Sequence, residues 1–182
     1  MNSKIIACIV EGNAEQAIMD LLIDNNVLIF SRDDLIDRKI LSGRYRNIDT
    51  FLAEYVDGRD FNGNIIDVYY LLDSKNQNTS HLDKRINIKP IHTSPEIEIL
   101  YIIYQGKHDD YVKKYQGGPN KMKASTYCKT ILKIKNVKTY DFIIDTFKNN
   151  INELIKAIKK HRFLHKDKYT IYNLFSEHFK EN

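Results

Sequence analysis

The sequence contains few cysteines, no long hydrophobic run and none of the common catalytic signature motifs. Only two of its 182 residues are cysteines, Cys8 and Cys128. Both stand among apolar neighbours, so we expect reduced thiols in a protein core. No CxxC pair or Cys/His cluster indicates a zinc site. The GxSxG, P-loop, Rossmann glycine and HExxH motifs are also missing, which gives no support to the enzyme classes they mark.

The hydrophobic runs are too short for a membrane protein. None approaches the ~20 apolar residues that a membrane helix needs. The apolar run near the start is short and lacks a cleavage site, so it does not have the pattern of a signal peptide. These features predict a cytoplasmic protein that does not enter the membrane.

Charge is divided unevenly along the chain. Residues 1–104 contain 11 Lys/Arg and 16 Asp/Glu, whereas residues 105–182 contain 17 Lys/Arg and 8 Asp/Glu. An acidic front half and a basic rear half fit a metal site beside an anionic polymer such as nucleic acid. Because no tight basic run is present, the lysines also fit ordinary solvated helix faces.

Two apolar segments that each end in a carboxylate are the most informative pattern. Residues 4–10 and 65–72 are mostly apolar, which predicts central strands of a covered, mostly parallel sheet. Glu11 follows the first segment and Asp73 follows the second. Ligands of open α/β sheets bind outside the carboxyl ends of the strands, so both carboxylates could meet at one Mg²⁺. Considered without the other, Glu11 also fits a solvated loop glutamate, and Asp73 also fits a residue that caps the following turn.

A second pair of acidic residues opens a later predicted helix. Residues 86–91 alternate like a half-buried strand, in which Pro90 favours an edge position, and residues 93–95 predict a helix start. Glu96 then fits the helix dipole as a first-turn acid. Glu98 stands between isoleucines, and burying its charge without a cation or a donor would be costly. We therefore expect Glu96 or Glu98 to complete the cation site.

Two groups of basic residues are candidates for contacts with nucleic acid. Arg44 and Arg46 flank Tyr45 in a predicted loop, where they could clamp a phosphate or simply be exposed. Lys75, two residues after Asp73, could pair with that carboxylate or neutralise a phosphate. The second group lies near the end of a predicted helix in the rear half and consists of Lys159, Lys160, Arg162, Lys166 and Lys168.

Helical spacing of apolar residues recurs from residue 108 towards the C-terminus. We therefore predict an α/β fold, with a mostly parallel sheet flanked by helices over residues 1–106. Residues 107–182 are expected to form a basic helical extension packed on that core. Residues 27–30 are expected to form an additional short strand.

Two of these segments carry a family resemblance. Ile-Val-Glu-Gly-Asn-Ala-Glu at residues 9–15, before an amphipathic helix, and Leu-Leu-Asp-Ser-Lys at residues 71–75 resemble the TOPRIM domain. That domain occurs in topoisomerases, primases, OLD nucleases and RloB-type proteins. Residues 93–100 also resemble the Asn-Pro-x-x-Glu helix of RloB-like proteins. The toxin subunit of the PARIS phage-defence system, and short proteins of low-GC Gram-positive bacteria, are similar in general plan.

The resemblance implies a TOPRIM-like fold and a nuclease that uses Mg²⁺, or Mn²⁺, to cleave RNA or DNA in bacterial phage defence. A protein partner such as an ATPase subunit is implied as well. The family places a Glu after strand one and Asp-x-Asp after strand three, which assigns Glu11 and Asp73 as metal ligands and catalytic residues. Lys75 stands where the second Asp is expected.

This departure leaves several alternatives open. Glu96 or Glu98 replaces the missing ligand, a single metal binds, or catalysis is lost and Lys75 neutralises the carboxylates. In the last case the chain would be a catalytically inert TOPRIM-like module that binds nucleic acid or a protein, as an inhibitor or a sensor.

Overall fold

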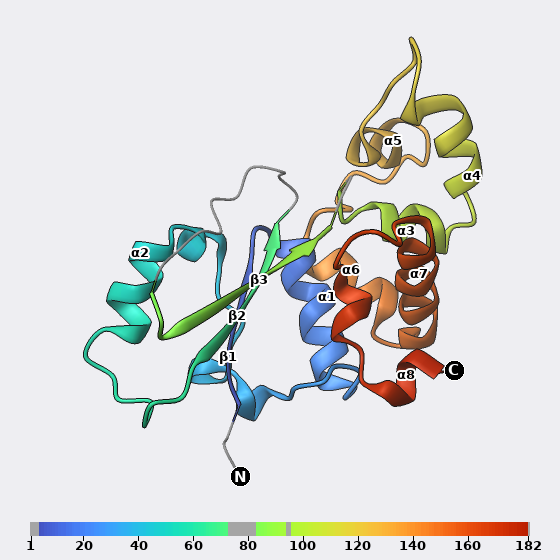
Figure 1. The fold of residues 1–182 in the computed structure, drawn as a ribbon. Helices are drawn as coiled ribbons and strands as arrows, with labels where there is room; N and C mark the ends of the chain where they lie inside the picture. Colours follow the sequence, from blue (N-terminus) through green and yellow to red (C-terminus); the bar gives the residue numbers. More distant parts are fainter. Residues whose placement is uncertain (1–3, 73–82, 94–95, 182) are drawn as a thin grey trace.

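The centre of the molecule is a three-stranded parallel sheet, as the sequence predicted (Figure 1). The computed structural model describes residues 4–72, 83–93 and 96–181 of the chain. The strands lie in the order β1-β2-β3 and comprise β1 (Ile5–Val10), β2 (Ile66–Leu72) and β3 (Ile86–His92). The α/β class and the flanking helices are thus confirmed.

The register brings the carboxyl ends of the strands to one edge of the sheet. Val10 lies opposite Leu71, and Leu72 lies opposite His92. The residues that follow β1 and β3 therefore emerge close to one another. This edge is where ligands bind in open parallel sheets.

Both faces of the sheet are covered, which explains the continuous apolar character of β1. Ile6, Cys8 and Val10 belong to the core shared with α1 (Asn13–Asp24), whereas Ala7 and Ile9 belong to a second core. The second core is closed by α2 (Ile48–Phe51), which continues as a π-helical segment over Leu52–Val56. Figure 1 shows α2 and α1 on opposite faces of the sheet.

The rear half of the chain is helical and shares its core with α1. Helix α6 packs against α1, and α7 packs against α3. Cys128, from the rear half, lies in the same core as Cys8, and both cysteines are buried and free, as the sequence predicted. The helices after β3 are α3 (Ile99–Tyr104), α4 (His108–Tyr111), α5 (Ala124–Thr130), α6 (Tyr140–Phe147), α7 (Ile151–Leu164) and α8 (Glu177–Glu181).

Local structure departs from the sequence predictions in two places and agrees with them in a third. The helix expected to open at residues 93–95 starts only at Ile99, so Glu96 is not a first-turn acid of α3, and its carboxylate instead accepts a hydrogen bond from the Ser125 N–H. Residues 27–30 form no strand, and only Leu28 makes an isolated antiparallel bridge, to Phe175. Pro90 lies on an edge strand as predicted, and the backbone N–H of His92 there donates to the Tyr169 carbonyl at 2.8 Å. Within the described part of the chain, no helix is long and apolar enough to cross a bilayer.

A buried carboxylate on α1 ties the front half to the rear half. Asp20 is only 8% exposed. It accepts hydrogen bonds from Arg32 Nη2 at 2.7 Å and from the Tyr140 hydroxyl at 3.1 Å. These contacts join α1 to the 3₁₀ turn that begins at Arg32 and to α6. The same guanidinium also pairs with the more exposed Asp24.

We expect Asp20→Ala to lower the free energy of unfolding by about 1–3 kcal/mol, because it removes two hydrogen bonds to a mostly buried charged group. Asp24→Ala removes an ion pair whose carboxylate side chain is 56% exposed and should cost less than about 1 kcal/mol. Urea unfolding of both variants compares the two losses. Equal losses would show that Asp20 does not link the two halves.

Candidate functional site

An open pocket of about 300 Å³ lies at the carboxyl edge of the sheet. Glu11 and Glu15 line it from the end of β1 and the first turn of α1. Glu96 and Glu98 line it from the segment between β3 and α3, and Lys138 from the segment before α6. We call it the carboxylate pocket.

The structure brings together three of the four carboxylates that the sequence nominated. Glu11, Glu96 and Glu98 share the pocket although they stand far apart in the sequence. Asp73 is the residue that follows β2 in the chain, but it and Lys75 lie outside the described residues. Their roles therefore stay predictions.

Glu98 is the most buried charged group of the pocket. Only 3% of it is exposed, and burial raises the pKa of its carboxyl above the usual value, against the opposing effect of the Lys138 ammonium. Lys138 Nζ lies 3.1 Å from Glu98 Oε1 and 4.0 Å from Glu96 Oε1. The ammonium thus supplies the cation that a buried carboxylate requires.

A short turn places the Lys138 side chain over the pocket. The next residue, Thr139, caps α6 by accepting a hydrogen bond from the Phe142 N–H, and its own N–H donates to the Asn136 carbonyl at 2.9 Å. Sequence reasoning missed Lys138. The apolar neighbours of Glu98 indicated that a cation was needed, but nothing in the sequence singles out one of the many lysines of the rear half.

Of the two predicted phosphate-clamping arginines, Arg46 pairs with a residue that lines the pocket, Glu11. Its Nη1 atom lies 3.2 Å from Glu11 Oε1, and its side chain is 62% exposed. Arg44 instead forms an ion pair with Glu54. The loop that carries both arginines is held down by the Tyr70 hydroxyl, which donates to the Tyr45 carbonyl.

The second predicted basic group lies elsewhere, and none of its five members lines the carboxylate pocket. The Arg162 guanidinium ends α7 by donating from Nη1 to the carbonyls of His165 at 2.9 Å, Lys168 at 2.8 Å and Lys166. The Lys166 ammonium lies 4.2 Å from the centre of the Phe163 ring. These two basic side chains therefore have structural partners within the chain. Lys159, Lys160 and Lys168 keep their predicted role as a hypothesis.

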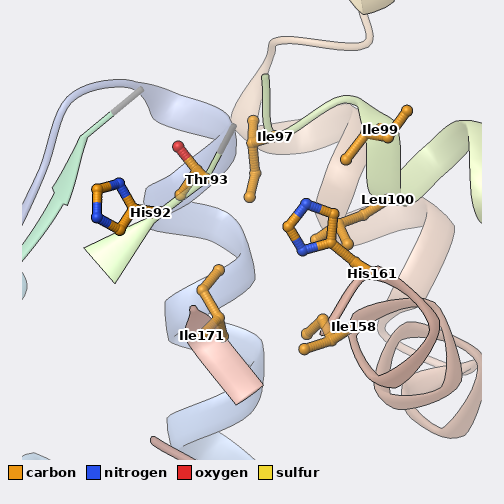
Figure 2. A pocket seen from close by; sticks show the side chains of 8 residues that line it. All are labelled: His92, Thr93, Ile97, Ile99, Leu100, Ile158, His161 and Ile171. Atoms are coloured by element: carbon orange, nitrogen blue, oxygen red, sulfur yellow. The ribbon is translucent and has the colours of Figure 1, made fainter. Parts of the chain in front are cut away.

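A separate small cavity lies where the end of β3 meets α7 (Figure 2). His92 and Thr93 line it from the strand side, and His161 lines it from the helix side. The Thr93 hydroxyl oxygen is buried and has no hydrogen-bond partner among the described residues. At about 10 Å³ the cavity holds at most about one water molecule. It is too small to be a substrate site.

The donors of the carboxylate pocket suit a hard cation such as Mg²⁺, which prefers carboxylate oxygens. The Lys138 ammonium already neutralises the nearly buried Glu98 carboxylate and would have to compete with such a cation. Among residues 4–72, 83–93 and 96–181, however, no group of three or more His, Cys, Asp or Glu is arranged to hold a metal ion. The chemistry of the donors fits the cation, but their arrangement within the described residues does not form a ligand set.

No protein-family model, no curated protein and no solved structure matches the chain. The resemblance to TOPRIM domains therefore rests on the short motifs described above. The carboxylate pocket is therefore the feature of the molecule from which a function can be inferred.

The close approach of the arginine-bearing loop to the end of β1 depends on one glycine. The segment before it is paired to β1, because the Leu41 N–H donates to the Cys8 carbonyl at 2.8 Å and the Val10 N–H donates to the Leu41 carbonyl at 2.9 Å. A Cβ atom on Gly43 would lie 2.9 Å from the Glu11 carbonyl oxygen and 3.3 Å from its Cα. Only glycine permits this approach of the loop to the end of the strand.

We expect Gly43→Ala to lower stability by about 1–3 kcal/mol, because the new methyl group meets backbone atoms that cannot yield without a shift of the loop. Gly117→Ala is the control, since a Cβ there has nothing within 4 Å and the residue is extended, with φ −138°. Gly117→Ala should leave the stability unchanged. Thermal unfolding of both variants measures the difference, and a wild-type melting temperature for Gly43→Ala would refute the tight approach.

Proposed function

We propose that the chain is a Mg²⁺-dependent nuclease with a TOPRIM-like core, acting on RNA or DNA. The observation that supports this most strongly is the gathering of Glu11, Glu96 and Glu98 in one open pocket at the carboxyl edge of a parallel sheet. Ligands of open parallel sheets bind at this edge, and a cluster of carboxylates there favours a cation. The resemblance extends the proposal to phage defence in the cytoplasm, with an ATPase-type partner.

Each residue of the pocket has a defined part in this proposal. Glu11, Asp73 and one of Glu96 or Glu98 would hold the cation. When bound, Mg²⁺, or Mn²⁺ in its place, supplies polarisation of a phosphodiester and activation of water. Arg46, exposed beside Glu11, is positioned to neutralise a phosphate that approaches the carboxylates.

We expect Asp73→Ala and Glu98→Gln to abolish Mg²⁺-dependent cleavage of RNA or DNA. Because even outer-shell partners of metal ligands are worth about 10–100-fold, removing a ligand should cost at least about 100-fold. Glu153→Gln, on the exposed side of α7, should leave cleavage unchanged. Cleavage is followed on labelled single strands and duplexes, and circular dichroism checks the fold. Efficient cleavage by Asp73→Ala would refute the site, and a wild type inactive with both Mg²⁺ and Mn²⁺ would refute the nuclease.

A second candidate is a catalytically inert TOPRIM-like module that binds nucleic acid or a protein partner. The observation that favours it is the ion pair of Lys138 with Glu98 at 3.1 Å. An ammonium at that position neutralises the buried carboxylate without any metal. In that case the pocket would keep the carboxylates of a cation site without holding a cation, and the binding surface for nucleic acid or a protein would lie beside it.

Lys138→Met tests this second candidate, because it removes the ammonium while keeping an unbranched side chain. Removing a unit positive charge a few ångströms from the carboxylates should tighten binding of Mg²⁺ or Mn²⁺ by at least about tenfold. Lys135→Met, at an exposed position nearby, should not. Calorimetric titration measures the affinities. Metal binding by Lys138→Met alone, with no cleavage by the wild type, would establish the inert module, whereas tight binding by the wild type would exclude it.

A further inference from the structure

A second open pocket, of about 540 Å³, adjoins the carboxylate pocket. The two pockets share one wall, the side chain of Glu96. Pockets that hold small organic ligands enclose about 300–1,000 Å³, so there is room for one nucleotide unit. The remaining lining comes from the segment that joins α4 to α5 and from the ends of those helices: Tyr111, Gln116, Lys121, Met122, Lys123 and Ala124.

The shared wall is held in place from both sides. Glu96 Oε2 accepts a hydrogen bond from the Ser125 N–H at 2.8 Å, at the start of α5. The other oxygen, Oε1, lies 4.0 Å from Lys138 Nζ in the carboxylate pocket. A bound polymer that lies across Glu96 would therefore pass directly from one pocket to the other.

The second pocket is preformed. The Tyr111 hydroxyl donates to the Met122 carbonyl at 2.9 Å, and the Met122 N–H donates to the Tyr115 carbonyl at 2.7 Å. The Tyr111 ring also packs edge-on against Tyr127, with the ring centres 5.1 Å apart. These contacts fix the segment that carries the two lysines against the core, so ordering it costs little on binding.

The rim of this pocket carries positive charge that no described residue neutralises through an ion pair. Lys121 and Lys123 are both exposed, and neither forms an ion pair with any described residue. Lys114, in contrast, is neutralised by Asp110 at 2.6 Å. The ammonium groups of Lys121 and Lys123 stand beside the carboxylate pocket, so they offset the repulsion between its carboxylates and an anionic polymer. Met122 adds an adaptable apolar surface, and Gln116 adds an amide that can both donate and accept hydrogen bonds.

We propose that this second pocket seats one unpaired nucleotide of a single-stranded nucleic acid. Lys121 and Lys123 hold its flanking phosphates, and the strand continues over Glu96 into the carboxylate pocket. A base within a duplex cannot enter, because its edge is paired and its faces are stacked. Cations that track the backbone are a general feature of single-strand binding. Here the apolar Met122 side chain, not an exposed aromatic ring, would face the base. The nature of the polymer rests on the proposed function, but the binding needs no catalysis.

The full chain is tested in EDTA, so that binding is measured without cleavage. Fluorescence anisotropy follows short single-stranded DNA and RNA oligonucleotides and a duplex of the same sequence over a range of salt concentrations. The test variant is Lys121→Gln/Lys123→Gln. The control is Lys133→Gln/Lys135→Gln, which removes the same charge from two exposed lysines of the rear half that line neither pocket.

The wild type should bind a single strand, DNA or RNA, at least about tenfold more tightly than the duplex. The test variant should lose at least about tenfold in affinity, and its salt dependence should fall by about 0.7 per lysine. The control should keep most of the affinity. Equal losses in both variants, equal binding of the duplex, or no binding by the wild type would overturn the proposal. Specific binding without cleavage in Mg²⁺ would refute only the nuclease, and cleavage unaffected by the test variant would refute only the nucleotide seat.

Discussion

A parallel sheet has to be covered on both faces, and this constraint shapes the whole chain. A covered strand of such a sheet, such as β1, is apolar on both sides, so both of its faces exclude water. The segment between β1 and β2 supplies one cover, through Phe51 and Tyr55. Helix α1 alone does not complete the other cover, and helices α3, α6 and α7 extend it. The rear half is therefore part of the core and does not merely sit on the surface of the sheet.

The same constraint produces the candidate site. Because the rear helices pack beside the carboxyl edge of the sheet, Glu96 and Glu98 are enclosed where they leave β3. A buried carboxylate must find a cation or hydrogen-bond donors. The rear half provides both, as the ammonium of Lys138 and the backbone N–H of Ser125. The front half supplies the remaining carboxylate, Glu11, so the pocket exists only when both halves are folded together.

The sequence predicted the parts of this arrangement that depend on local pattern. Apolar strands that end in acids located Glu11, and the isoleucines around Glu98 indicated a buried charge. Contacts that depend on the approach of distant segments could not be predicted. Lys138 has the same local appearance as its neighbouring lysines, and only the packing of α6 on α1 brings it to Glu98. The Arg162 guanidinium, in contrast, makes local contacts with the carbonyls that follow its own helix, and these contacts leave its predicted role toward nucleic acid a hypothesis.

The uneven charge of the chain acquires a physical meaning from these contacts. A cluster of carboxylates repels a phosphodiester chain unless cations stand between them. The structure provides cations in two places. Lys138 lies beside the buried Glu98, and Lys121 and Lys123, which form no ion pair with a described residue, lie on the neighbouring rim. The Lys138 ammonium and a divalent cation compete for the Glu98 carboxylate. Either of them neutralises that carboxylate, and the repulsion between the two positive charges disfavours binding both together. Under the proposed function, the affinity of this pocket for a divalent cation relative to the Lys138 side chain therefore separates the enzyme from the inert binding module.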